Sequence, residues 1–156
     1  MKKYLFVFMV MFLLTDLFSQ IDYLELRDQY TLSCHKSDSV ELIQNKRFLD
    51  SLTEYKITNG EEKFLYDYGM TYYTIYLKWK SIDALLKSTE ANQKCWEEYQ
   101  NYNALWNLGM NYGILGDCDK KLELTELYIK EMIQNELDEY IDYKEIYYRY
   151  KSCRNN

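Results

Sequence analysis

The sequence contains no proline and only five glycines among its 156 residues. Proline interrupts helices and glycine weakens them, whereas a fold built only of β-strands needs many turn residues. The scarcity of both therefore argues against an all-β fold and favours long helices joined by short turns. Hydrophobic residues make up 47% of the chain, which is enough for one domain with one core.

Basic runs longer than two residues are also missing outside the interleaved charges of the expected helices. The formal net charge is −6, so the chain lacks the basic surface with which nucleic-acid binders neutralise phosphates. An acidic surface also gives no electrostatic attraction to an anionic membrane. We therefore expect neither nucleic acid nor a membrane surface as a partner.

Residues that carry catalysis or bind metals are scarce. The single histidine, His35, adjoins Cys34, but sequence neighbours rarely face each other as a catalytic dyad must. The sequence has no zinc-ligand spacing and no glycine-rich phosphate loop. Asp117-Cys118-Asp119 lacks the later ligands of a calcium loop. We therefore expect no enzymatic activity, no metal and no cofactor.

Residues 1–19 have the layout of a secretory signal peptide. Lys2 and Lys3 precede an uncharged apolar run over residues 4–14, which is too short for a membrane-spanning helix of ~20 residues. Cleavage is expected after Ser19, leaving residues 20–156 as an exported domain, periplasmic or extracellular, without a membrane anchor. The alternative is that the segment stays uncleaved as an N-terminal anchor.

Periodic hydrophobic positions predict an all-α fold for the remaining chain. Residues 21–36 have no clean period and are either a loose helix or an extended segment. A helix is expected from Asp38, with Glu41 completing a capping box, to the helix-ending Gly60. Further helices are expected over residues 61–78, 81–94, 97–115, 120–134 and 137–151.

Two segments resemble each other at an offset of 40 residues (109 − 69). Residues 65–72 read LYDYGMTY and residues 105–112 read LWNLGMNY, with Leu, Gly, Met and Tyr identical. A fixed period of this size is typical of stacked helical hairpins. We expect Gly109 to let the paired helix approach closely and Gly116 to let the chain reverse in a tight turn.

The stretch from Leu105 to Asp117 resembles the first helix and turn of a tetratricopeptide repeat. A bulky residue, then Leu-Gly, then Tyr stand at the spacings of that family, and Gly116-Asp117 stands at its turn. The resemblance implies two hairpin repeats and a capping helix, over about residues 62–94, 102–134 and 137–151.

In tetratricopeptide-like arrays the first helix of each hairpin lines a concave face that binds a protein or peptide. Matched by position, the contact residues that the resemblance implies are Tyr66, Met70, Tyr73, Trp106, Met110 and Gly113. Aromatic and methionine side chains are favoured at adaptable contact surfaces. The alternative is that these residues pack as ordinary core. We therefore expect an exported protein- or peptide-binding module.

A different function would follow if the end of the chain were a docking surface. The last expected helix carries four tyrosines spaced 3, 4 and 3, which should face the core of a monomer: Tyr140, Tyr143, Tyr147 and Tyr150. Exposure of Tyr148 and Ile141 as well would indicate a structural or assembly subunit of an envelope complex. A small inhibitor or immunity-type protein is a third alternative.

The four cysteines suit an oxidising compartment. Cys118 begins one expected helix and Cys153 ends the next, and the mean of 118 and 153, 135.5, falls in the loop between them. Residues equidistant from the loop of an antiparallel hairpin lie at the same height, so we expect a Cys118–Cys153 disulfide. Four reduced thiols are the alternative, and a pairing of Cys34 with Cys95 is left open.

Overall fold

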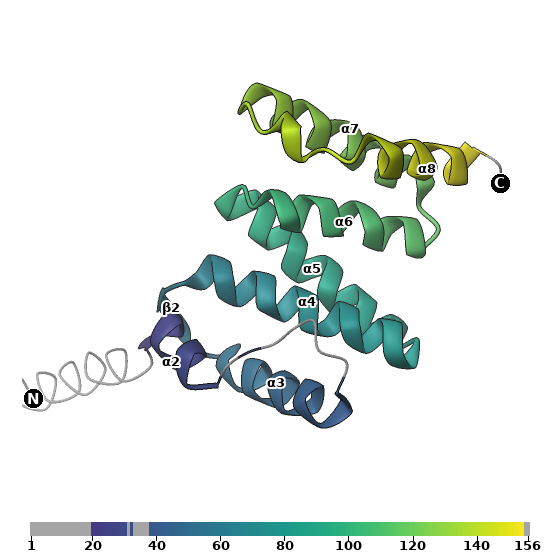
Figure 1. The fold of residues 1–156 in the computed structure, drawn as a ribbon. Helices are drawn as coiled ribbons and strands as arrows, with labels where there is room; N and C mark the ends of the chain where they lie inside the picture. Colours follow the sequence, from purple (N-terminus) through teal and green to yellow (C-terminus); the bar gives the residue numbers. More distant parts are fainter. Residues whose placement is uncertain (1–19, 31, 33–37, 155–156) are drawn as a thin grey trace, which may run out of the picture. The chain divides into compact units, whose positions relative to one another are not determined.

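The computed structural model describes residues 20–30, 32 and 38–154 (Figure 1). The expected signal peptide, Cys34 and His35 lie outside these residues. Seven α-helices make up most of what is described, which confirms the all-α prediction. The described residues fall into two compact units, which divide between Phe64 and Leu65.

The first unit contains two short strands that the sequence did not predict. Its elements are β1 (Gln20–Asp22), α2 (Tyr23–Tyr30), α3 (Ser39–Leu52) and β2 (Lys56–Asn59). β1 pairs with β2 in parallel, with Ile21 opposite Ile57. The predicted start of α3 is confirmed, because the Asp38 side chain accepts a hydrogen bond from the Val40 N–H at 2.7 Å. The predicted end at Gly60 is wrong, because residues 56–59 are extended to pair with β1.

The remaining elements are α4 (Glu61–Trp79), α5 (Ile82–Tyr99), α6 (Tyr102–Ile114), α7 (Cys118–Gln134), the 3-10 helix η1 (Asp138–Tyr140) and α8 (Tyr143–Arg154). Short polar residues cap three of these helices. The side chains of Ser81, Asn101 and Asp117 each accept a hydrogen bond from the N–H three residues later. Capping satisfies a backbone donor that has no partner inside the helix. Gly116 adopts a φ of +88° in the turn before α7, as the sequence predicts.

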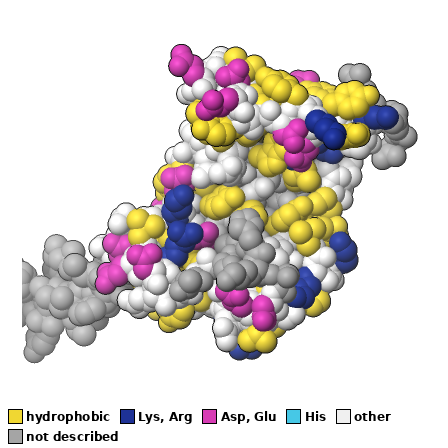
Figure 2. Space-filling model, in the orientation of Figure 1, with side chains coloured by type: hydrophobic (Ala, Val, Ile, Leu, Met, Phe, Trp, Pro, Cys, Tyr) yellow, Lys and Arg dark blue, Asp and Glu magenta, His cyan; other side chains and the backbone are white. Residues whose placement is uncertain are grey.

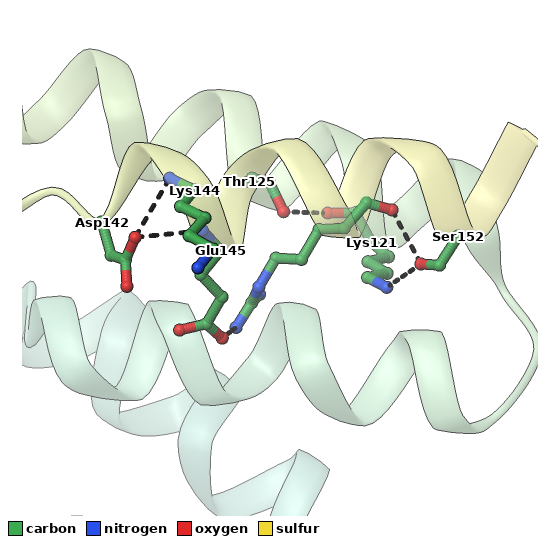
Figure 3. A network of polar contacts seen from close by, with 7 residues as sticks. Lys121, Thr125, Asp142, Lys144, Glu145 and Ser152 are labelled. Carbon is green, nitrogen blue, oxygen red and sulfur yellow. Dashed lines mark hydrogen bonds and ion pairs between the residues drawn. The ribbon is translucent and has the colours of Figure 1, made fainter.

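Two predicted boundaries are wrong. The break expected near residues 94–97 does not occur, because α5 continues through Glu97 to Tyr99 and is capped by Gln100, which has a φ of +53°. The last helix was expected from residue 137 but begins at Tyr143. Glu136 has a positive φ of 57°, and the Asp142 carboxylate caps α8 by accepting from the Lys144 and Glu145 N–H groups at 3.0 Å each (Figure 3).

The core of the second unit lies between α6 and its neighbours. α6 contacts α5 on one side and α7 on the other, and α8 lies along α7 (Figure 1). Two apolar clusters fill these contacts, one of Leu105, Leu108 and Leu124 and one of Met132, Ile141 and Ile146. None of the helices described is long and apolar enough to cross a membrane.

Candidate protein-binding face

All six predicted contact residues are half-buried. Tyr66, Met70 and Tyr73 lie on α4, and Trp106, Met110 and Gly113 lie on α6. One hydrogen bond brings the two sets together, because the Asn107 Nδ2 donates to the Met70 Sδ at 3.1 Å. Asn107 directly follows Trp106, so the repeat-related segments of α4 and α6 adjoin. We call these six residues, which lie on α4 and α6, the α4–α6 face.

Trp106 has neighbours from α7 and α8 that the repeat alone does not reveal. Its indole packs against the apolar cluster of Met132, Ile141 and Ile146. The ring centroid lies 4.9 Å from that of Tyr128 on α7. The guanidinium carbon of Arg149 on α8 lies 3.3 Å from the Trp106 ring centroid, in a cation–π contact. One side of this indole is therefore covered within the protein itself.

Arg149 is the most unusual polar residue of the second unit, because it is only 4% exposed. Its Nη2 donates to the Glu145 Oε1 at 3.3 Å. Its Nε and Nη1 are buried and have no hydrogen-bond partner among the described residues. Burial lowers the pKa of Arg149, and the charge and hydrogen bond of Glu145 act in the opposite direction. The Glu145 side chain extends from α8 toward α6 (Figure 3) and is 46% exposed.

Three further polar residues interact electrostatically with Arg149. Burial raises the pKa values of the Tyr73 and Tyr128 phenols, and the Arg149 charge acts in the opposite direction on both. Burial, followed by the charge of Arg149, lowers the pKa of Lys121. Tyr73 of the α4–α6 face therefore lies within electrostatic reach of α8. We call Arg149, Glu145, Tyr73, Tyr128 and Lys121 the Arg149 cluster.

The glycines of the two repeat segments differ in how closely neighbouring atoms approach them. A Cβ on Gly69 would lie 2.9 Å from the Asn92 Nδ2, so α4 and α5 approach closely there. The expectation that Gly109 lets its paired helix approach closely is wrong. A Cβ on Gly109 would lie 3.6 Å from its nearest neighbour, the Leu124 Cβ, which is an ordinary contact distance. A Cβ on Gly113 would lie 2.6 Å from the Lys121 Cδ. Gly113 thus makes room for the Lys121 stem and offers a partner little side-chain contact.

The predicted site residues do not include Arg149. Extending the 40-residue period by one step gives 109 + 40 = 149, so Arg149 stands at the position of Gly69 and Gly109. The pattern itself does not recur there, because its Leu, Gly, Met and Tyr are replaced by Glu145, Arg149, Tyr150 and Ser152. Arginine is rarely buried, so composition and periodicity alone give no reason to place it inside.

The predicted disulfide is confirmed. Cys118 and Cys153 are bonded, with their Cα atoms 5.4 Å apart, and join the start of α7 to the end of α8. The Lys121 Nζ donates to the Ser152 Oγ at 3.2 Å, one turn along from the disulfide (Figure 3). Cys95 is fully buried in α5. α8, and with it Arg149, is therefore held covalently to the rest of the unit.

The tyrosine stripe expected to face the core is only partly buried. Tyr140, Tyr143 and Tyr147 are exposed, and Tyr150 alone of the four packs against the apolar cluster of Met132. The inward-facing positions of this end of the chain are instead taken by Ile141, Ile146 and Arg149.

Across the described residues, no group of three or more His, Cys, Asp or Glu side chains is arranged to hold a metal ion. Comparison of the chain with protein-family models, with curated proteins and with solved structures gives no significant match. The α4–α6 face and the Arg149 cluster are therefore the candidate functional features of the described residues.

Proposed function

We propose that this protein is an exported, tetratricopeptide-like module that binds a protein or peptide partner through the α4–α6 face. The proposal is carried by one observation: the Asn107–Met70 hydrogen bond joins two repeat-related helices whose aromatic and methionine side chains are half-buried. Half-buried aromatic and methionine side chains offer apolar contact area that already has a fixed position. The same side chains contribute to the core, so binding would use an existing, ordered surface.

Export is supported by the layout of residues 1–19 and by the Cys118–Cys153 disulfide, since disulfides persist in oxidising compartments. N-terminal sequencing of the protein recovered outside the cytoplasm should begin at Gln20 or within a few residues of it. A full-length, cytoplasmic product would contradict export.

Partner binding is tested by capture from an envelope extract with three forms of the protein. Wild type is compared with Tyr73→Ser on the α4–α6 face and with Leu86→Ser, which removes an exposed apolar side chain of α5. Thermal melts first establish that each variant is folded. We expect a protein that is retained by wild type and Leu86→Ser and lost with Tyr73→Ser. Equal retention by all three forms would contradict the proposed face.

The exposed tyrosines of α8 favour a second candidate function, as an assembly subunit. Tyr148 is 56% exposed, whereas Ile141 is only 7% exposed, so one of the two residues expected to extend this surface does so. Figure 2 shows hydrophobic side chains gathered over the α7–α8 end. Sedimentation at increasing concentration should reveal self-association that Tyr147→Ser weakens. A monomer at all concentrations would contradict self-assembly through this end.

A further inference from the structure

The donors of Arg149 are an unusual feature in the interior of the second unit. Nε and Nη1 are both buried, and within the part of the chain that the structure describes neither has an acceptor. Burying a hydrogen-bonding group without a partner is unfavourable, more so when the group is charged. Native proteins leave few such groups, and those that remain call for a functional or structural explanation.

The surroundings of Arg149 favour a negative charge. Lys121 is close enough for the Arg149 charge to lower its pKa, so two cations share the site. The Tyr73 and Tyr128 phenols are within electrostatic reach of the guanidinium, and the Trp106 ring covers one of its faces. Of the described groups that act electrostatically on Arg149, Glu145 is the only carboxylate. The local balance is therefore positive.

Glu145 fills the site incompletely. Its single hydrogen bond to the Nη2 is 3.3 Å long, whereas charge-assisted bonds of this kind are commonly ~2.7–2.9 Å. A guanidinium can give a carboxylate two parallel hydrogen bonds, and Glu145 receives one. The Glu145 side chain is nearly half exposed, so water can hydrate it when it leaves the site.

We propose that Arg149 anchors a carboxylate-binding site, in which a carboxylate of the partner displaces Glu145. The incoming group accepts hydrogen bonds from two nitrogens of the guanidinium, which stays stacked on Trp106. We infer a carboxylate as the ligand group because the Glu145 carboxylate already occupies the site in the free protein. This inference rests on the proposed function only in assigning the carboxylate to a protein or peptide.

The probe is sodium acetate, titrated against sodium chloride at constant ionic strength. The readout is the NMR signal of the Trp106 indole N–H, identified by its loss in Trp106→Phe. We expect a saturable shift with acetate that chloride does not reproduce. Glu145→Gln removes the competing charge, so acetate should bind roughly tenfold tighter, the factor of about one charge-assisted hydrogen bond.

Two variants of Arg149 complete the test. Arg149→Met should abolish the shift, and Arg149→Lys, which keeps the charge but loses the planar fork, should weaken it. A thermal melt confirms that each variant is folded. An equal shift in Arg149→Met, or tighter binding of phosphate than of acetate, would overturn the proposal.

The source of the carboxylate is resolved with two short peptides of otherwise equal sequence. One has a free C-terminus and no acidic side chain, and the other has an amidated C-terminus and one glutamate. The peptide that competes with acetate identifies the source, and failure of both would overturn the assignment to a peptide. If a captured partner is lost with Tyr73→Ser but bound equally by Arg149→Met, the function stands and the carboxylate site fails. If acetate binds but no partner is captured, the carboxylate site stands and the proposed function fails.

Discussion

The guanidinium of Arg149 on α8 lies 3.3 Å above the ring centroid of Trp106 on α6, with Tyr128 of α7 against the same indole at 4.9 Å. This stack joins three helices at one point. It also places a buried charge beside the residues that the repeat assigns to partner contact. Trp106, one of the six residues of the α4–α6 face, thus also packs against the core.

Replacement of Trp106 by alanine should destabilise the protein by roughly 3 kcal/mol, near the lower end for large core truncations, because the indole is only half-buried. The free energy of unfolding in urea measures the change. Trp79→Ala is the matched control, since Trp79 is exposed at the end of α4 and its loss should change little. Equal effects of the two substitutions would show that Trp106 is not part of the core.

Arg149→Met should leave the free energy of unfolding unchanged or raise it by about 1–2 kcal/mol. Methionine fills a similar volume without burying a charge, and such replacements are often neutral or stabilising. Glu145→Ala should instead lower stability by about 1 kcal/mol, because Arg149 then loses its hydrogen-bond acceptor. The loss is small because the Glu145 side chain is half exposed and solvent already weakens its interaction with Arg149. Urea denaturation measures both variants. A large loss of stability in Arg149→Met would contradict the finding that two buried donors of Arg149 lack hydrogen-bond partners among the described residues.

The phenol of Tyr73 should titrate above its ordinary pKa of 10.0, because burial disfavours the phenolate. The folded state therefore prefers the neutral form, and this contribution to stability is lost as the pH rises above 10 through the folded-state pKa. Arg149→Met should raise the pKa of Tyr73 further, since the Arg149 charge opposes the shift. Carbon-13 NMR of labelled tyrosine, assigned with Tyr73→Phe, measures the pKa. Lys151→Met, which removes an exposed charge of α8, should leave it unmoved.

Reduction of the Cys118–Cys153 bond should lower stability by about 3–4 kcal/mol in the chain-entropy model, given a sequence separation of 35 residues. Cys153→Ser should lower stability to the same extent, and reducing agent should then have no further effect on that variant. Peptide mapping without reductant should recover the linked pair. Equal stability of the oxidised and reduced proteins would show that the bond does not hold α8 in place.

Local sequence patterns predicted much of the helical architecture. They failed where contacts between residues far apart in the sequence determine the secondary structure. The caps at Asp38 and Asp117 and the reversal at Gly116 follow from short-range backbone chemistry, so the sequence contains them. The extended residues 56–59 pair with β1, more than 30 residues earlier, and no local period reveals such pairing. Glu97 fits the end of one helix as well as the start of another, which explains the misplaced break.

The candidate site was predictable in part. The 40-residue repeat identified Met70 and Trp106, and the structure brings their segments together through Asn107. Arg149 is buried against Trp106, which lies 43 positions earlier in the chain (149 − 106). The sequence of α8 alone does not reveal this contact, and its spacing predicts tyrosines on the core-facing side. The structure instead exposes Tyr147 and buries Arg149.

The most direct test of the proposed function is photocrosslinking in intact exporting cells. A photoreactive phenylalanine analogue replaces Tyr73 on the α4–α6 face in one form and Tyr99, an exposed aromatic residue of α5, in the other. We predict a discrete crosslinked partner from position 73 that is absent from position 99. The same crosslink from both positions, or none from position 73 while position 99 forms one, would contradict it.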